Sequence, residues 1–138
     1  MKINEIDPDY ETVKIDQIGV IDSLNGAVVF RDETVEFTMS GFSSEVARYI
    51  SNFLEGKREE PPTIYKLVEQ ICEENEMCLV KVKIYEGGDI FRANLYFTGK
   101  KDLVFRNFRA SDAIALATYY SIPILIRKSL LKKIENQK

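Results

Sequence analysis

A short segment near the C-terminus, Arg109-Ala110-Ser111-Asp112, combines a cation, a hydroxyl and a carboxylate within four residues. An arginine guanidinium grips a phosphate through two parallel hydrogen bonds, and the free N–H groups of a helix N-terminus favour the same anion. Ser111 is of a type that caps helices, and the Ala/Leu-rich run after it predicts a helix to about Tyr120. We therefore expect Arg109 and Ser111 to bind a phosphate at a helix start.

A second serine–acid pair, Ser44-Glu45, lies 67 residues earlier and also precedes a helical apolar pattern. If the two segments are duplicates, Glu45 and Asp112 could face each other near a pseudo-twofold axis. The alternative is structural, because an acid in the first turn of a helix contributes about 0.3–1 kcal/mol and a serine cap about 1 kcal/mol. Arg109 would then pair with Asp112, or with Glu45, and the site would catalyse nothing. The sequence leaves both interpretations open.

The sequence contains no histidine, which excludes several classes of chemistry. It rules out Ser-His-Asp and Cys-His triads, an imidazole base and a zinc site with histidine ligands. Cys72 and Cys78 are isolated, and two cysteines without histidine make a poor zinc site. Any chemistry must rest on carboxylates, Arg, Lys, Tyr, Ser or Cys.

The net charge of −3 hides an asymmetry between the two ends of the chain. Residues 99–138 carry nine Lys or Arg against three Asp or Glu, a net +6, whereas residues 1–98 carry a net −9. A solvated surface with one basic end explains this pattern, and a basic patch for a phosphate or nucleic acid is the sharper hypothesis. No apolar run approaches the roughly 18–20 residues that a bilayer requires. We expect a cytoplasmic protein with no membrane segment.

The elements that must position these residues are predicted by alternating and helical apolar patterns. Val80, Val82 and Ile84 alternate with polar neighbours, as in a half-buried strand, and two glycine-containing turns separate this strand from two more. We expect one α+β domain over 1–138, with duplicated strand-strand-strand-helix units at about 12–56 and 79–121, joined by a helix at 63–75. Mainly antiparallel sheets should pack with the helices in layers.

Several apolar and aromatic positions complete this prediction. The 63–75 helix has one apolar stripe, and a last helix capped by Ser129 should turn Leu130, Leu131 and Ile134 inward and Lys132, Lys133 and Lys138 outward. We expect the strand phenylalanines Phe91, Phe97, Phe105 and Phe108 to lie in the core. Tyr85 and Tyr96 have the opposite parity, so they are candidates for exposure, for stacking on bases or for a packing interface.

The nine residues Arg109–Ala117, followed by Ile122-Pro123-Ile124, resemble the Arg-Pro-Ser-Asp-Ala-Ile-Ala-Leu-Ala signature of the bifunctional nuclease family, also catalogued as domain of unknown function 151. The resemblance extends over about residues 12–133. The segment 39–47, with Gly41 and Glu45, is similar to the family's Ile-Gly-x-x-Glu-Ala segment, and Pro61-Pro62 stands at its Pro-rich stretch. This resemblance implies nuclease activity on DNA or RNA, as in some plant members.

What the resemblance implies for the site is a metal-dependent hydrolysis of phosphodiesters. Asp112 and Glu45 would then be catalytic ligands of Mg²⁺ or Mn²⁺, with Arg109 and Ser111 on the phosphate. The sequence departs from the family pattern at Asn107, where the family has an acid, and at Tyr65-Lys66, where it has a His-Asp pair.

Two other function classes remain open on the sequence. One is a non-catalytic module that binds nucleic acid or another anion, and the other is a structural or assembly domain. A homodimer is expected in any of these cases, because small layered domains with exposed sheet edges often pair.

Overall fold

The computed structural model describes residues 6–58 and 63–134 and confirms an α+β fold. Three strands followed by a helix occur twice, and α2 joins the two runs, as the patterns predict. Pro61-Pro62 lies outside the described residues. In chain order the elements are β1 (Tyr10–Val20), β2 (Asn25–Arg31), β3 (Val35–Ser43), α1 (Ser44–Leu54), α2 (Ile64–Glu74), β4 (Cys78–Gly87), β5 (Ile90–Thr98), β6 (Leu103–Arg109), α3 (Ala110–Tyr120), β7 (Ile124–Arg127), a 3-10 turn (Lys128–Leu130) and β8 (Lys132–Lys133).

The strands form one eight-stranded sheet in the order β6-β5-β4-β7-β1-β2-β3-β8. Every neighbouring pair is antiparallel except β4 and β7, which are parallel. The long strand β1 pairs first with β7 and then with β2, so it belongs to both halves of the sheet. Although four strands separate β3 from β5, the rings of Phe37 and Phe91 meet edge-on with centroids 5.1 Å apart. The sheet therefore curls until its two halves touch.

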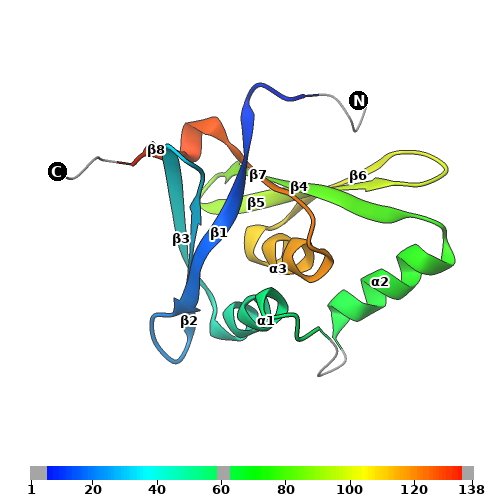
Figure 1. Cartoon of the computed structure of the whole chain (residues 1–138), viewed down its shortest axis with the longest axis horizontal. Helices are drawn as coiled ribbons and strands as arrows, with labels where there is room; N and C mark the ends of the chain where they lie inside the picture. Colours follow the sequence, from blue (N-terminus) through cyan, green and yellow to red (C-terminus); the bar gives the residue numbers. More distant parts are fainter. Residues whose placement is uncertain (1–5, 59–62, 135–138) are drawn as a thin grey trace.

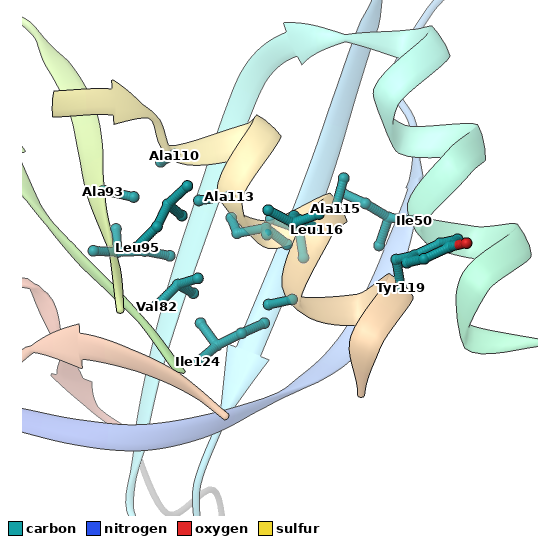
Figure 2. Packing of buried hydrophobic residues seen from close by; sticks show 14 of the residues in the cluster. Ile50, Val82, Ala93, Leu95, Ala110, Ala113, Ala115, Leu116, Tyr119 and Ile124 are labelled. Carbon is teal, nitrogen blue, oxygen red and sulfur yellow. The ribbon is translucent and has the colours of Figure 1, made fainter. Parts of the chain in front are cut away.

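Helix α3 fills the concave side of this curled sheet (Figure 1). Nine of its eleven residues are buried, which a helix tolerates only when it is apolar on nearly all sides. Figure 2 shows α3 between Leu95, Val82 and Ile124 of the sheet and Ile50 of α1. Its alanines keep the helix thin, so that both layers approach it closely.

On the opposite face of the sheet, the Lys83 side chain of β4 is buried beneath Asp7 and Tyr10. The Lys83 side chain is only 4% exposed, and its Nζ donates a 2.8 Å hydrogen bond to Asp7. The same ammonium lies 4.8 Å and 5.1 Å from the ring centroids of Tyr10 and Tyr96. Tyr96, a candidate for exposure from its parity, is consequently buried, whereas Tyr85 is half-buried.

The predicted C-terminal helix is wrong. Ser129 lies in the 3-10 turn, and the chain then extends as β8, where Lys132 and Lys133 pair with Glu36 and Val35 of β3. The open edge of β3 offers backbone hydrogen bonds that outweigh a weak helical pattern. Leu130 and Leu131 still pack against the core, as expected, and Lys138 lies outside the described residues.

Strand β6 corrects the expectation that all four strand phenylalanines are core residues. Phe97 is buried and Phe91 is half-buried, but Phe105 and Phe108 are 46% and 43% exposed. The strand is the outermost one of the sheet, and its register with β5 shifts near Asn107, which has a φ of 68°. Because of this bulge, Phe105 and Phe108 pair with Leu95 and Ala93 and share the helix side of the sheet, where they are only partly covered.

No helix within the described ranges is long and apolar enough to cross a membrane.

We predict that enlarging an α3 alanine destabilises the whole fold. Ala115 is 0% exposed, so Ala115→Leu should lower the free energy of unfolding by about 1–3 kcal/mol through overpacking. Gln70→Leu, at an exposed position of α2, is the matched control. It should change the free energy of unfolding by less than about 0.5 kcal/mol. Urea denaturation measures both variants, and equal midpoints for them would contradict the packing described here.

A second prediction concerns pH and the Asp7–Lys83 pair. The hydrogen bond from Lys83 holds the pKa of Asp7 below its ordinary value of 3.8. Because the folded pKa is the lower one, this stabilisation is fully present above the unfolded value and is lost as the pH falls through the folded value. At neutral pH, Asp7→Asn should cost about 1.5–3 kcal/mol of unfolding free energy.

The same measurement in acid provides the check on this linkage. The difference between wild type and Asp7→Asn should shrink steadily below pH 3.8. Asp9→Asn removes a neighbouring exposed carboxylate and serves as the control. A difference that stays constant as the pH is lowered would show that the carboxylate charge does not stabilise the fold.

Candidate functional site

Arg109, Ser111 and Asp112 lie where β6 turns directly into α3. Arg109 is the last residue of the strand and occupies the N-cap position, with extended backbone angles and no side-chain cap. The helix begins at Ala110, so the prediction that Ser111 caps it is wrong. Ser111 instead lies in the first turn and is 7% exposed.

Arg109 and Asp112 form a two-pronged ion pair across one turn of α3. Nε of Arg109 donates to Oδ2 of Asp112 at 2.9 Å, and Nη2 donates to Oδ1 at 3.1 Å. The pair raises the pKa of Arg109, first through these hydrogen bonds. The Arg109 side chain is nevertheless 68% exposed. A guanidinium has five N–H donors, so three remain for a ligand beside the two that Asp112 accepts.

The corresponding junction in the first half, between β3 and α1, has a different capping pattern from the one expected. Ser43 rather than Ser44 caps the helix, and its Oγ accepts a hydrogen bond from the N–H of Glu45 at 3.1 Å. Ser44 is buried and donates to the carbonyl of Ser23 at 2.9 Å. Glu45 is exposed and makes no ion pair with any residue in the described ranges. The partner of Arg109 is therefore Asp112.

Tyr65, near the start of α2, packs against the other two helices. It is 6% exposed and packs edge-on against Tyr49 and Phe53 of α1, with ring centroids 5.7 Å and 5.3 Å away. Burial, followed by the nearby carboxylate of Asp112 and to a smaller extent that of Glu45, raises the pKa of Tyr65 to about 12. Both acids thus act on one hydroxyl, which keeps its proton at neutral pH.

A hollow of about 310 Å³ separates the two strand-to-helix junctions. One wall is the β3 end from Ser40 to Ser43, and the facing wall is the segment from Arg109 to Ser111. The turn between β4 and β5, at Asp89 to Phe91, forms a third side. Gly41 has a φ of 85°, a backbone conformation that glycine adopts without strain. Arg109 and Ser111 share this hollow, whereas Asp112 and Glu45 are not among its lining residues.

The carboxylates do not fit a divalent metal as they stand. Mg²⁺ needs about six oxygen ligands in near-octahedral geometry. Within residues 6–58 and 63–134, no three or more His, Cys, Asp or Glu side chains are grouped so that they could hold a metal ion. Both oxygens of Asp112 are already bonded to Arg109. The arrangement that this site does fit is an anion beside an exposed guanidinium.

Asn107 supports the site rather than lining it. Its Oδ1 accepts a 2.6 Å hydrogen bond from the hydroxyl of Tyr85, and its N–H donates to Oδ1 of Asn94 at 3.3 Å. Sequence reasoning identified Asn107 only as a departure from the family pattern. Asparagine tolerates the left-handed conformation better than most residues, which was the available signal for a bulge here.

Sequence reasoning also missed the aromatic group of Tyr49, Tyr65 and Tyr119, which joins the three helices. Tyr119 stacks on Tyr65 at 6.4 Å and donates a 3.0 Å hydrogen bond to Glu69 of α2. The rings come from three separate helices, so no spacing within one segment marks them as a group. They hold α1, α2 and α3 together.

Comparison with known proteins identifies the family to which this chain belongs. The bifunctional nuclease domain matches residues 41–138, a range that includes all three helices and both sides of the hollow. No curated protein matches the sequence. Since the match spans well over half of the chain, the chain belongs to the bifunctional nuclease domain family.

Proposed function

We propose that this chain binds nucleic acid, with Arg109 as the group that holds a backbone phosphate. The observation that carries the proposal is the position of its guanidinium, which is 68% exposed on the rim of the hollow and has donors beyond those bonded to Asp112. The first N–H groups of α3 lie beside it and favour an anion. Asp112 acts as a positioning residue, because it fixes the orientation of the guanidinium.

The surrounding charge supports a polyanion rather than a single phosphate. Lys100, Lys101 and Arg106 are exposed on the turn before β6 and on β6 itself, along the strand that ends at Arg109. Phosphate contacts supply most of the affinity of proteins for nucleic acids, and each contact adds to the salt dependence of binding. A strand that carries a row of cations to Arg109 is suited to follow a phosphate backbone.

The second candidate is hydrolysis of DNA or RNA, which the family match favours. In that case Asp112 and Glu45 are the ligands of Mg²⁺ or Mn²⁺. Their present arrangement does not provide a metal site, so we rank binding first.

Binding is tested with single-stranded DNA and RNA oligonucleotides by fluorescence anisotropy. Arg109→Ala should weaken binding about tenfold and reduce the slope of log affinity against log salt by about one. Lys14→Ala removes an exposed cation of β1, far along the chain from the site, and should leave both quantities nearly unchanged. If Arg109→Ala behaves like Lys14→Ala, Arg109 is not the phosphate-binding group.

Hydrolysis is tested on the same oligonucleotides with Mg²⁺, with Mn²⁺ and with EDTA. The binding proposal predicts that complexes form equally in EDTA and that the strands stay intact. Cleavage that needs a metal ion, and that is lost in both Asp112→Asn and Glu45→Gln, would establish the second candidate instead. Gel analysis of labelled strands distinguishes the two results.

A further inference from the structure

We infer that the hollow between the two strand-to-helix junctions binds one unpaired guanine base of the nucleic acid whose phosphate Arg109 holds. The inference rests on the proposed function, and it names the base that the same site selects. The hollow measures about 310 Å³, which is at the small end of the range for ligand pockets, about 300–1,000 Å³. A space of this size suits a single base rather than a base pair.

The hydroxyl of Ser111 is a polar group of the hollow without a partner. Ser111 is 7% exposed and lines the hollow, and within the described part of the chain its hydroxyl makes no hydrogen bond. Its counterpart Ser44 is equally buried, but it donates to the carbonyl of Ser23 at 2.9 Å. A nearly buried hydroxyl that the protein leaves unsatisfied is free to bond a ligand. Because Ser111 follows Arg109 into the first turn of α3, its hydroxyl is placed to donate to the same phosphate.

Two phenylalanine rings on different walls of the hollow provide surfaces on which a flat base can stack. Phe42 lies near the end of β3 and Phe91 near the start of β5, and both are half-buried. The Phe42 ring packs over Gly26 of β2. Phe91 meets Phe37 edge-on, with centroids 5.1 Å apart, where the β4–β5 hairpin lies beside β3 (Figure 1). Both rings are therefore held in place, and stacking on them favours a base of any kind.

The carboxylate of Asp89 distinguishes guanine from the other bases. Asp89 is exposed in the turn between β4 and β5, and within the described residues its carboxylate has no hydrogen bond or ion pair. A carboxylate only accepts hydrogen bonds, and it accepts two at once. Guanine presents two adjacent donors, N1–H and the N2 amino group, whereas the other common bases place an acceptor beside their donor. Arg109 lines a different wall, so the phosphate and the base meet groups of opposite character.

Other occupants fit the hollow less well. A free phosphate would use Arg109 and Ser111, but it would leave both rings without a contact and add a second negative charge to the Asp89 carboxylate. A divalent cation would meet the Arg109 guanidinium. An apolar ligand would cover the Asp89 carboxylate without giving it a donor, which is costly. A guanine nucleotide matches the cation, the rings and the carboxylate together.

Fluorescence anisotropy with short single-stranded oligothymidines, whose central base is varied, tests the inference. The wild type should bind the strand with a central guanine about tenfold more tightly than strands with adenine, cytosine or thymine there, as expected for a bidentate contact. Hypoxanthine lacks the N2 amino group of guanine, so a central hypoxanthine should lose most of this preference.

Two matched carboxylate variants assign the preference to Asp89. Asp89→Asn should reduce the preference for guanine to less than about twofold, because the amide offers only one acceptor oxygen. Asp32→Asn removes the same charge from the turn between β2 and β3, at the other end of β3, and should keep the full preference. Since the preference is a ratio of two affinities, a general effect of charge on oligonucleotide binding cancels.

A second pair of variants tests the stacking surface. Phe42→Leu should weaken binding of the guanine strand about tenfold. Phe105→Leu makes the same change to a 46% exposed ring of β6 that does not line the hollow, so it should weaken binding less than about twofold. Circular dichroism confirms that each variant is folded.

Three results would overturn the inference. The first is an equal affinity of the wild type for all four central bases; if Arg109→Ala still weakens binding, the proposed function stands and only the base assignment fails. The second is a guanine preference that Asp89→Asn and Asp32→Asn leave equally intact. The third is the absence of binding to any strand, which overturns the proposed function as well and is thereby distinguished from the first.

Discussion

Helix α3 is packed between α1 and the half of the curled sheet formed by β4, β5 and β6, and this close packing determines where the rest of the molecule lies. Alanine occupies four of the nine buried positions of α3, so the helix is thin and both neighbouring layers can approach it closely. Since β6 runs into α3 without a loop, the depth at which α3 lies also fixes the end of β6. Arg109 is therefore presented at the rim of the hollow by the packing of a core helix, rather than by a flexible connection.

The chemistry that this site can support depends on the residues around the rim of the hollow. Where the family pattern has a histidine, Tyr65 is a buried phenol whose pKa is raised to about 12, so it cannot accept a proton at neutral pH as an imidazole can. Where the family pattern has an acid, Asn107 carries no charge and holds a bulge through hydrogen bonds with Tyr85 and Asn94. The groups that remain charged at the site are Arg109, Asp112 and Glu45, of which the first two neutralise each other. The N–H donors of Arg109 that Asp112 leaves free can still hold an anion, whereas neither Tyr65 nor Asn107 can activate water.

Most strands and helices could be predicted from local sequence patterns. What could not be predicted was whether another element of the fold covers a given strand or side chain. Alternation over 80–85 and 91–97 predicted β4 and β5 because one side of each strand faces α3. The same reasoning misplaced Phe105 and Phe108, since alternation gives the parity of a side chain and not whether an edge strand is covered. The prediction for Ser129 was wrong because it ignored the open edge of β3, which lies far away in the sequence.

The site was predicted in part for similar reasons. The short spacing from Arg109 to Asp112 allowed their ion pair to be considered from the sequence, whereas the packing of Tyr65 against Tyr49 and Tyr119 joins three helices and required the tertiary structure. The helix caps were displaced by one or two residues, because Ser43 and Ser44 are both suitable caps and only backbone geometry distinguishes them.

The central claim is that the Arg109 guanidinium, held by Asp112, is the group that meets a phosphate. The most direct measurement follows the side-chain Nε–H resonance of Arg109 by ¹⁵N–¹H NMR while a short single-stranded oligonucleotide is added in EDTA. The account predicts that this resonance shifts together with the backbone amides of Ala110 and Ser111, and that Asp112→Asn weakens the effect. Saturable binding that leaves the Arg109 resonance unchanged would contradict it.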